Sequence, residues 1–403
     1  MNRRVVITGT GAVTPLGVGA DTLIDRWADG QCGISDGIGA CREFDPLDFL
    51  SKKESRRADR FTQLAVVSAT EALERAGWAG ELPYAPERIG CIIGTGIGGI
   101  GSLEDQGAVM RERGAKSVSP LAVPLMMSNA AAAAVAMRFG LMGETYGIVS
   151  ACAAGAHAIV AATRLVQSGQ VDAVVTGGSE SAMTGIAMAA FASMGATSPS
   201  GISRPFDARR DGFVMGEGAG VLVIENADAA EARGVDSIGE VLGYGATCDA
   251  HHLTAPDPAG TQSARAIRMA LEDAGLRPED LDYVNAHGTS TPLNDRSETD
   301  ALKLALGNTA RTVPVSSTKS AIGHLMGAAG AVEAVATIGA LRRGVAPPTV
   351  GYEEAEDGLD LDYVPGEARN LRLPQPAGDG RRYAISNSFG FGGHNAVLCL
   401  AAT

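Results

Sequence analysis

Two periodicities of apolar residues alternate along the whole chain. Short apolar runs rich in Val and Ile predict buried β-strands at 4–7, 88–93, 173–176, 220–224 and 282–285. Longer stretches, with apolar residues three or four positions apart, predict helices at 59–76, 153–168, 260–274 and 327–342. Strands and helices that alternate in this way are typical of an α/β protein. Residues 374–379 are the clearest surface loop near the C-terminus.

The chain also contains an internal repeat. Residues 149–169 and residues 315–344 both run through Val-Ser, a turn of small residues, an Ala-rich helix and a closing Gly. The small faces of the two helices predict close packing against sheets. The repeat suggests an ancient duplication, with an N-terminal half at 1–240 and a C-terminal half at 241–403 that meet near Gly239.

Composition narrows the class of protein. Of 403 residues, 45% are hydrophobic, only 4% are aromatic and 53 are Gly, so the core must be built from small aliphatic side chains and close backbone packing. A net charge of −13 argues against nucleic acid as the main partner. The Ala-rich segment 130–136 is too short for a membrane span. Six scattered Cys without a C-x-x-C pair indicate neither a zinc site nor a redox dithiol, and predict a reduced, cytoplasmic protein.

Cys152 is the candidate nucleophile. It lies where a β-like run ending in Val149 breaks into small residues and then into a helical pattern. That places a thiol at a strand-to-helix elbow, where the free N–H groups of the helix N-terminus favour the thiolate. Taken alone, a Cys among Ala and Gly is more often a small buried residue, so catalysis would require partners for Cys152.

Three polar residues in turns are candidate partners. His287 follows a predicted strand and precedes a Gly, where it can reach a substrate carbonyl, and His324 lies in a second turn of small residues. Taken alone, either one could equally be a core histidine whose hydrogen bonds are satisfied within the protein. Lys319 would need an acidic partner if it is buried, and Glu298 and Glu333 are the candidates. One activated Cys and two His suggest acyl chemistry on a thioester.

Two glycine-rich segments have competing interpretations. Residues 94–99 match G-x-G-x-x-G, but no clean second strand with an acidic residue follows. We therefore expect close backbone packing or a pocket wall there, and no nicotinamide binding. Phe389 and Phe391 alternate with Gly near the C-terminus. The flanking glycines permit the backbone swings of a gate, or the segment is a tight turn that only buries the two rings.

One basic cluster interrupts this acidic chain, at residues 52–60. The cluster consists of Lys52, Lys53, Arg56, Arg57 and Arg60. On a continuous helix, all of them except Lys52 would fall on one face. The cluster is either a solvated face or a dock for an acidic partner.

Together, several segments resemble one family, the β-ketoacyl-acyl-carrier-protein synthases of thiolase fold, of the elongating kind. These segments are 5–11, 206–220, 285–292, 316–324 and 387–393. The resemblance implies an α/β, thiolase-like fold with a duplicated five-layer α-β-α-β-α architecture. It also implies an acyltransferase that joins an acyl-enzyme thioester to malonyl-acyl-carrier protein by decarboxylative Claisen condensation, which lengthens the chain by two carbons. Because the phosphopantetheine arrives on the acyl carrier protein, no metal and no further cofactor is expected.

The resemblance assigns roles to the candidate residues. Cys152 matches the nucleophile, and its N–H group and that of Phe391 match the oxyanion hole. His287 and His324 match the paired histidines, and Lys319 matches the lysine. Glu298 and Glu333 match two acidic positions near that lysine. Phe391 with Phe389 matches the gate, and Thr289 and Thr291 match two contacts of the pantetheine.

Departures from the family pattern leave the substrate open. Ala122 stands where relatives carry a bulky residue that reaches across the dimer into the partner's acyl pocket, and Ile97 is expected to line the far wall of the pocket. Cys152 is followed by Ala-Ala-Gly where the family often has Thr-Ser-Gly, and His394 replaces a frequent Thr. The chain could extend fatty acids, or be the catalytic subunit of a type II polyketide system, as a homodimer or as a heterodimer with a related subunit. A non-catalytic chain-length subunit is disfavoured because Cys152 is present.

Overall fold

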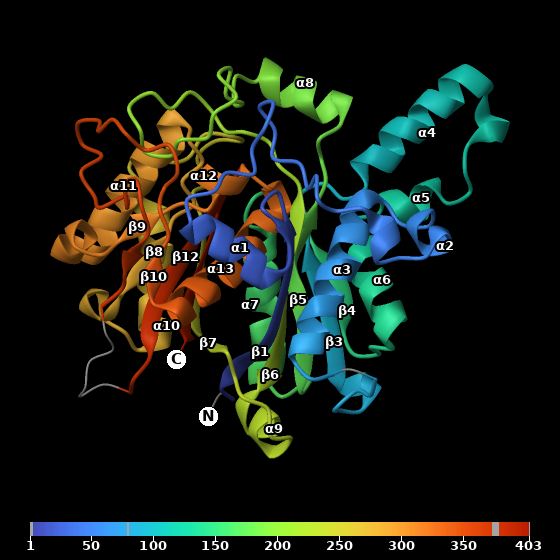
Figure 1. Cartoon of the computed structure of the whole chain (residues 1–403), viewed down its shortest axis with the longest axis horizontal. Helices are drawn as coiled ribbons and strands as arrows, with labels where there is room; N and C mark the ends of the chain where they lie inside the picture. Colours follow the sequence, from blue (N-terminus) through green and yellow to red (C-terminus); the bar gives the residue numbers. More distant parts are fainter. Residues whose placement is uncertain (1–2, 79, 373–378, 403) are drawn as a thin grey trace.

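The computed structural model of the chain describes residues 3–78, 80–372 and 379–402 (Figure 1). Within these residues, 11 strands form one mixed sheet in the order β4-β3-β5-β6-β1-β7-β13-β12-β8-β9, with β2 paired to β1, while β10 and β11 form a separate pair. The strands are β1 (Val5–Thr14), β2 (Gly17–Val18), β3 (Ile89–Gly94), β4 (Thr145–Ile148), β5 (Ala173–Glu180), β6 (Gly218–Asn226), β7 (Gly239–Cys248), β8 (Tyr283–Asn285), β9 (Val315–Ser316), β10 (Val345–Ala346), β11 (Arg369–Asn370), β12 (Arg382–Gly390) and β13 (His394–Ala402).

Helices connect and cover these strands. They are α1 (Ala20–Ala28), α2 (Lys52–Ser55), α3 (Arg60–Arg75), α4 (Ile100–Arg113), α5 (Ala122–Met126), α6 (Ala130–Phe139), α7 (Ala154–Gln167), α8 (Gly185–Ser193), α9 (Ala227–Ala232), α10 (Thr261–Ala274), α11 (Pro292–Leu306), α12 (Lys319–Ile322) and α13 (Ala329–Arg343). In this part of the chain, no helix is both long and apolar enough to cross a membrane.

The elements form the five layers that the resemblance implies. Helices α7 and α13 lie in the centre, where α7 contacts β3, β4 and β5, and α13 contacts β6, β12 and β13 (Figure 1). Outside them, α3 and α6 cover the strands of the N-terminal half, and α10 covers β7 and β13 of the C-terminal half. The two halves of the sheet join where β1 pairs with β7, at Val6↔Glu240 and Ile7↔Gly239. The junction lies next to the predicted meeting point at Gly239, and the division into domains at 240/241 stays a prediction.

Burial on both faces explains why the strands read as apolar runs. Every residue of β5 and of β6 is buried, because helices cover both sides of the sheet. All five strands and four helices predicted from periodicity are confirmed. The prediction for 173–176 stopped short, because β5 continues to Glu180 through backbone pairing with β6 although its last residues carry no apolar signal. Residues 374–378 of the expected loop lie outside the described residues.

The expectation of one continuous basic helix at 52–60 is wrong. Helix α2 ends at Ser55 and α3 begins at Arg60. Asp59 has an extended backbone and caps α3, since its carboxylate accepts a hydrogen bond from the N–H group of Phe61 at 3.2 Å. The basic residues therefore lie on a helix, a turn and a second helix, and not on one helical face.

The ends of strands from both halves bring the candidate residues together. β3, β4 and β5 are parallel neighbours, and so are β12, β8 and β9, so within each set the carboxyl ends meet at one edge. Residues from the segments after β4, β8, β9 and β12 line one cavity, so the fold brings the two sets of strand ends together. These four segments carry Cys152, His287, Lys319 with His324, and Phe391.

Candidate active site

Cys152 lies at the elbow between β4 and α7. β4 ends at Ile148 and α7 begins at Ala154. Ala151 has φ 50°, a left-handed conformation that residues other than Gly rarely adopt. The tight turn places the side chain of Cys152, which is 8% exposed, at the N-terminal end of α7. The predicted strand-to-helix elbow is confirmed.

Burial dominates the protonation state of Cys152. It raises the pKa of the thiol to about 11, while the charge of Lys319 and the backbone N–H group of Phe391 act in the opposite direction. The N-terminus of α7 also favours the thiolate. Because desolvation outweighs these effects, the resting side chain is a thiol near neutral pH, contrary to the expectation of a thiolate.

The segment after β12 faces the elbow. An added Cβ atom on Gly390 would lie 3.1 Å from the backbone nitrogen of Cys152. Only a residue without a side chain therefore keeps the N–H group of Cys152 uncovered. The N–H group of Phe391 donates toward the sulfur of Cys152. Both expected donors of the oxyanion hole thus lie beside the nucleophile.

The tautomer of His324 follows from a backbone contact. The N–H group of Met326 donates to Nδ1 of His324 at 3.1 Å, so Nδ1 carries no proton in the neutral ring and Nε2 does. Met326 itself has φ 47°. Burial and the charge of Lys319 hold the pKa of His324 well below its usual value. His324 is consequently a neutral donor through Nε2.

Contacts with Lys319 indicate that His287 is also neutral, with its proton on Nε2. The ammonium group of Lys319 lies 3.2 Å from Nδ1 of His287, donates to the carbonyl oxygen of His287 at 2.7 Å, and forms an ion pair with Glu333. Because the ammonium can only donate, Nδ1 of His287 accepts and Nε2 carries the proton. Burial, followed by the charge of Lys319, holds the pKa of His287 well below its usual value.

The two acidic candidates have different functions. Glu333 is the ion-pair partner of Lys319, as one of the two alternatives predicted. Glu298 instead accepts hydrogen bonds from the backbone N–H groups of His287 and Gly288, at 2.8 and 2.7 Å. Burial raises the pKa of Glu298 to about 7, against those donors. Glu298 therefore holds the turn that carries His287.

A cavity of about 440 Å³ connects these groups. Its walls include Cys152, His287 and His324, whose two imidazole rings lie edge to face with centroids 5.4 Å apart. Other predicted site residues also line it, namely Ile97, Thr289, Thr291, Phe389 and Phe391. Thr289 and Thr291 share a hydrogen bond of 2.8 Å between their hydroxyl groups. The pocket wall expected at residues 94–99 is confirmed by Gly96 and Ile97.

Ala122 is not part of this cavity wall. It lies in α5, next to α4, which projects from the body of the molecule and has no buried residue (Figure 1). Its expected role in a partner's pocket stays a prediction. Sequence reasoning missed Phe191 and Phe213, which line the cavity, with Phe213 edge-on to His324 at 5.4 Å between centroids. Phe213 could have been found, because it lies inside the motif at 206–220.

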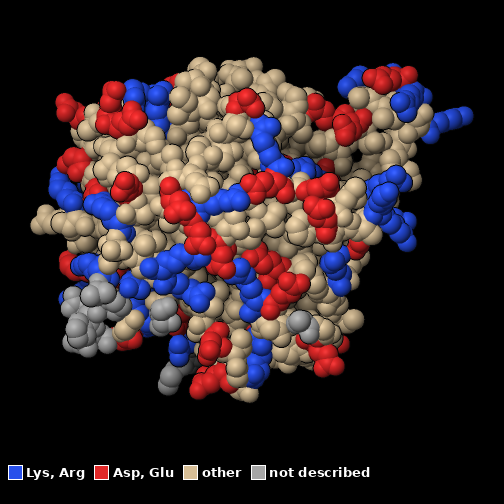
Figure 2. Space-filling model, viewed as in Figure 1, with Lys and Arg blue, Asp and Glu red and all other residues tan. Residues whose placement is uncertain are grey.

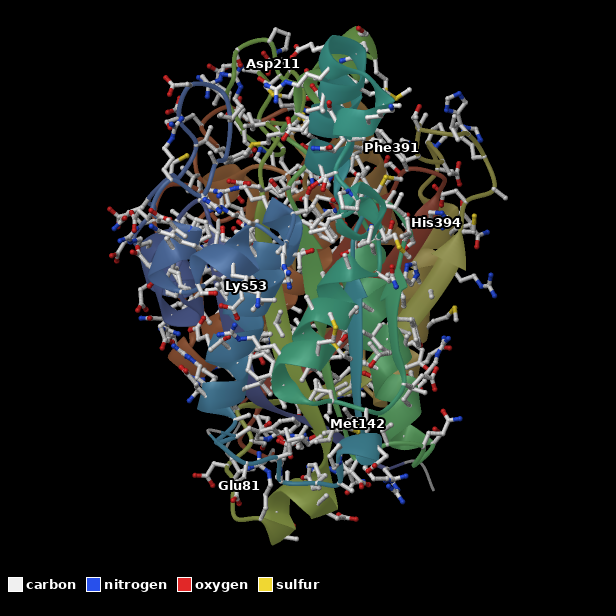
Figure 3. All side chains as sticks on the ribbon, turned by 90° about the vertical axis from the view of Figure 1, so that its right-hand side faces the viewer. Lys53, Glu81, Met142, Asp211, Phe391 and His394 are labelled. Carbon is white, nitrogen blue, oxygen red and sulfur yellow. The ribbon has the colours of Figure 1, made fainter. Side chains whose placement is uncertain are left out.

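The basic cluster separates into exposed residues and one paired residue. Lys52, Lys53, Arg56 and Arg57 are exposed, and Lys and Arg side chains protrude where α2 lies (Figure 2). Phe391 lies nearer than Lys53 to the end of the molecule that carries Asp211 (Figure 3). Arg60 instead pairs with Glu217 through two contacts of 2.7 Å.

Comparison with known proteins identifies the family. Residues 2–230 match the model "Beta-ketoacyl synthase, N-terminal domain" and residues 238–353 match "Beta-ketoacyl synthase, C-terminal domain". The chain belongs to the β-ketoacyl synthase family. It is 46% identical to 3-oxoacyl-[acyl-carrier-protein] synthase 2 of Synechocystis sp., over 98% of this chain and 97% of that protein.

Solved structures of β-ketoacyl synthases share the fold. The ishigamide ketosynthase/chain length factor matches with a TM-score of 0.90 and 31% identity, over 100% of both chains. A type II polyketide ketosynthase in complex with its acyl-carrier protein, AntDE:AntF, also has a TM-score of 0.90, at 29% identity over 100% of both chains. The thiolase-like fold and the family resemblance are thereby confirmed. Among the described residues, no group of three or more His, Cys, Asp and Glu is arranged to hold a metal ion.

Proposed function

We propose that this β-ketoacyl synthase carries its acyl group on Cys152 and stabilises the enolate through His287 and His324. Membership of the family makes it an acyltransferase that performs the chain-elongating Claisen condensation. One observation carries the assignment of residues. Two neutral imidazoles, each with Nδ1 occupied by a donor, line the same cavity as a cysteine at a helix N-terminus.

In the loading step, an acyl group moves from the phosphopantetheine thiol of a carrier protein to Cys152. The sulfur of Cys152 attacks the thioester carbonyl, the new C–S bond forms as the old one breaks, and the proton of the Cys152 thiol ends on the released carrier thiol. The N–H groups of Cys152 and Phe391 are the proposed donors to the tetrahedral oxyanion.

In the condensation step, malonyl-carrier protein loses CO2. The Nε2–H groups of His287 and His324 donate to its thioester carbonyl, where the enolate charge develops. The carbanion then attacks the acyl group on Cys152, the C–S bond breaks, and the sulfur regains a proton from solvent. Lys319 keeps both rings neutral, because its charge opposes theirs. Thr289 and Thr291 are the proposed contacts of the pantetheine.

Fatty-acid elongation is the pathway that we propose first. Its support is the 46% identity over nearly the whole chain with a 3-oxoacyl-[acyl-carrier-protein] synthase 2. A type II polyketide pathway is the second candidate, supported by the equally complete structural match to polyketide ketosynthases. Location in the cytoplasm is also proposed, supported by six cysteines that are all free thiols.

The partners proposed are an acyl carrier protein and a second ketosynthase-like subunit. β4 is an edge strand of the sheet, and beside it Met137, Met142 and Val149 are 78%, 66% and 55% exposed. Exposed apolar side chains at an edge strand support burial against another subunit. The exposed residues Lys52, Lys53, Arg56 and Arg57 are the proposed dock for an acidic carrier protein.

Intact-mass spectrometry of two variants tests this function. Cys152→Ala should form no acyl-enzyme and release no elongated product. His324→Ala should still be acylated on Cys152, yet release CO2 from malonyl-carrier protein about 10²–10⁴-fold more slowly, the usual contribution of a positioned acid or base. A covalent acyl-enzyme in the Cys152→Ala variant, or normal CO2 release by His324→Ala, would refute the assignment.

The same experiment distinguishes the pathways. Wild-type protein is loaded from a panel of fatty-acyl and polyketide carrier proteins, with Cys91→Ala as the matched control, because Cys91 is a fully buried thiol of β3. Acylation by fatty-acyl carrier protein alone would support the first candidate. Acylation that requires a polyketide carrier protein would support the second.

A further inference from the structure

Glu180 is a buried carboxylate beside the cavity that the proposed reaction does not use. It is the last residue of β5 and is completely buried. β5 lies between β3 and β6, so Glu180 emerges at the edge of the sheet where the site is built. Burying a charged group is unfavourable unless its surroundings compensate for the lost water, so the contacts of Glu180 need an explanation.

The contacts of Glu180 come from two segments far apart in the chain. Thr95 donates its hydroxyl proton to Oε1 at 2.9 Å, and the N–H group of Gly96 donates to Oε2 at 2.5 Å. The N–H group of Gly327 donates to the same Oε2 atom at 3.1 Å. Burial raises the pKa of Glu180, but all three partners donate to its oxygens, and these hydrogen bonds favour the ionised carboxylate.

The segments around Gly96 and Gly327 both contribute residues to the candidate active site. Ile97, which follows Gly96, lines the cavity. Met326, which precedes Gly327, donates to Nδ1 of His324 and holds the strained φ of 47°. The two backbones touch, since an added Cβ atom on Gly327 would lie 2.0 Å from the nitrogen of Gly96. The N–H groups of Gly96 and Gly327 both point at Oε2 of Glu180, and they would repel one another without the carboxylate between them.

We propose that Glu180 is a positioning residue of the condensing site, which joins Thr95 and Gly96, at the start of the Gly96–Ile97 wall of the acyl cavity, to the turn that sets the tautomer of His324. This inference rests on the proposed roles of Cys152 and His324. The carboxylate acts through the backbone and not by contact with substrate. One side chain thereby determines both where the acyl chain ends and whether His324 presents Nε2–H.

The negative charge has a second, measurable effect. Glu180 contributes to raising the pKa of Cys152, after burial, the dominant cause. Removing the charge while keeping the volume should therefore make the thiol titrate at lower pH. This titration reports the charge of Glu180, whereas CO2 release and product length report what Glu180 holds in place.

Three variants separate these effects. Glu180→Gln keeps the shape of the side chain, but its NH2 group can only donate. It would therefore face at least one of the donors that now bind the carboxylate, and that hydrogen bond would be lost. We expect Cys152 to remain acylated and to titrate at lower pH, and CO2 release to fall by about 10²-fold, the effect of displacing a catalytic group by roughly 1 Å. Thr95→Val removes only the wall contact, so it should change the length of the longest product and leave CO2 release unchanged. Glu180→Asp keeps the charge, so its thiol titration should stay as in the wild type.

Glu225→Gln is the matched control. Glu225 is also fully buried and accepts from Tyr84 at 2.6 Å and from Arg233, but it pairs with Ala173 at the other end of β5. That position is roughly 23 Å from Glu180, at about 3.3 Å per residue. It should change neither the thiol titration nor the products.

The readouts are iodoacetamide alkylation of Cys152 against pH, CO2 release from malonyl-carrier protein, and product length by mass spectrometry. Wild-type values for Glu180→Gln in all three would overturn the proposal. If Glu180→Gln does not fold, Thr95→Val is the test of the positioning role. A change in CO2 release by Thr95→Val without a change in product length would overturn that role. If wild-type Cys152 is never acylated, the proposed function fails instead, so the two failures are distinguishable.

Discussion

At the scale of single residues, burial and the charge of one cation together determine the protonation of the two histidines. The ammonium group of Lys319 contacts Nδ1 and the carbonyl oxygen of His287 and pairs with Glu333. Burial is the larger cause of the low pKa of both histidines, and the charge of Lys319 is the next. A histidine whose pKa is depressed stays neutral as the pH falls, until the pH passes through the lowered value.

Replacing Lys319 should move the acid limb of the reaction. In Lys319→Met the pKa of His287 and of His324 rises, so the rings become protonated at higher pH and CO2 release should fall off at higher pH than in the wild type. The measurement is CO2 release from malonyl-carrier protein between about pH 5 and 8, the range in which histidine usually titrates. Lys303→Met is the control, because Lys303 pairs with Asp360 on the surface of α11. An acid limb at the same pH in Lys319→Met and wild type would contradict the role of Lys319.

At the scale of elements, the segment from α2 to the start of α3 combines two functions. Its exposed cations lie on α2 and on the following turn, while Arg60 begins α3 and binds Glu217. Glu217 also accepts hydrogen bonds from Ser181, at 2.7 Å, and from the N–H group of Cys41, at 3.1 Å. The ion pair thus anchors the segment, and the exposed cations are left for a partner.

Charge reversal should weaken docking without changing the chemistry. Arg56→Glu with Arg57→Glu should raise the KM for carrier-bound substrates and leave the kinetics with small thioester mimics unchanged. Affinity of the wild type should fall with added salt, because exposed charges are screened beyond about 8 Å at physiological ionic strength. The control is Arg265→Glu with Arg268→Glu, two exposed arginines of α10. An unchanged KM in the first pair would mean that the segment is only a solvated surface.

Arg60 should affect stability. In Arg60→Met the carboxylate of Glu217 stays buried without its cation. We expect the free energy of unfolding to fall by about 2 kcal/mol, less than the loss for a fully buried pair because the side chain of Arg60 is 37% exposed. Urea denaturation measures the change. Equal stability of Arg60→Met and Arg56→Met would show that the ion pair with Glu217 adds nothing.

At the scale of the whole molecule, residues of one chain line the described cavity, and Ala122 lies outside it in α5. α4 projects from the body, and the chain returns to α5 at the base of this projection (Figure 1). Leu103, Met110 and Val123 are exposed on these two helices. If this projection enters a partner subunit, Ala122 bounds the partner's acyl cavity, whereas Ile97 bounds its own.

Mixed dimers should separate the two positions. A subunit with Cys152→Ala and Ala122→Phe is paired with a wild-type subunit, which alone can be acylated. We expect shorter products than from the pairing with Cys152→Ala alone, since each buried CH2 group contributes about 0.8 kcal/mol to acyl binding. Ile97→Phe should shorten products only when it is in the subunit that carries Cys152. Products of wild-type length from the Ala122→Phe pairing, measured by mass spectrometry, would show that the residue does not reach the partner's cavity.

Much of this molecule could be predicted from its sequence. The long helices and central strands were recognised because burial on one or both faces leaves a period in the apolar residues, as in α3 and α7. The elbow at Cys152 was recognised because small residues mark the change from strand to helix. The last residues of β5 were missed, since Gly177 and Glu180 are held by pairing with β6 and carry no apolar signal.

The sequence by itself therefore determined the order of the main strands and helices, and its resemblance to one family gave the layers and the candidate residues Cys152, His287 and His324. Only the tertiary structure decided which charges meet. Glu333 is 14 residues from Lys319, Glu217 is 157 residues from Arg60, and Gly327 is 147 residues from Glu180. The structure likewise decided that Cys152 is a thiol at rest, because the pKa depends on how completely the fold removes water from the sulfur. Local sequence controls backbone conformation over a few residues, whereas pairing and desolvation depend on groups that the chain brings together only when it folds.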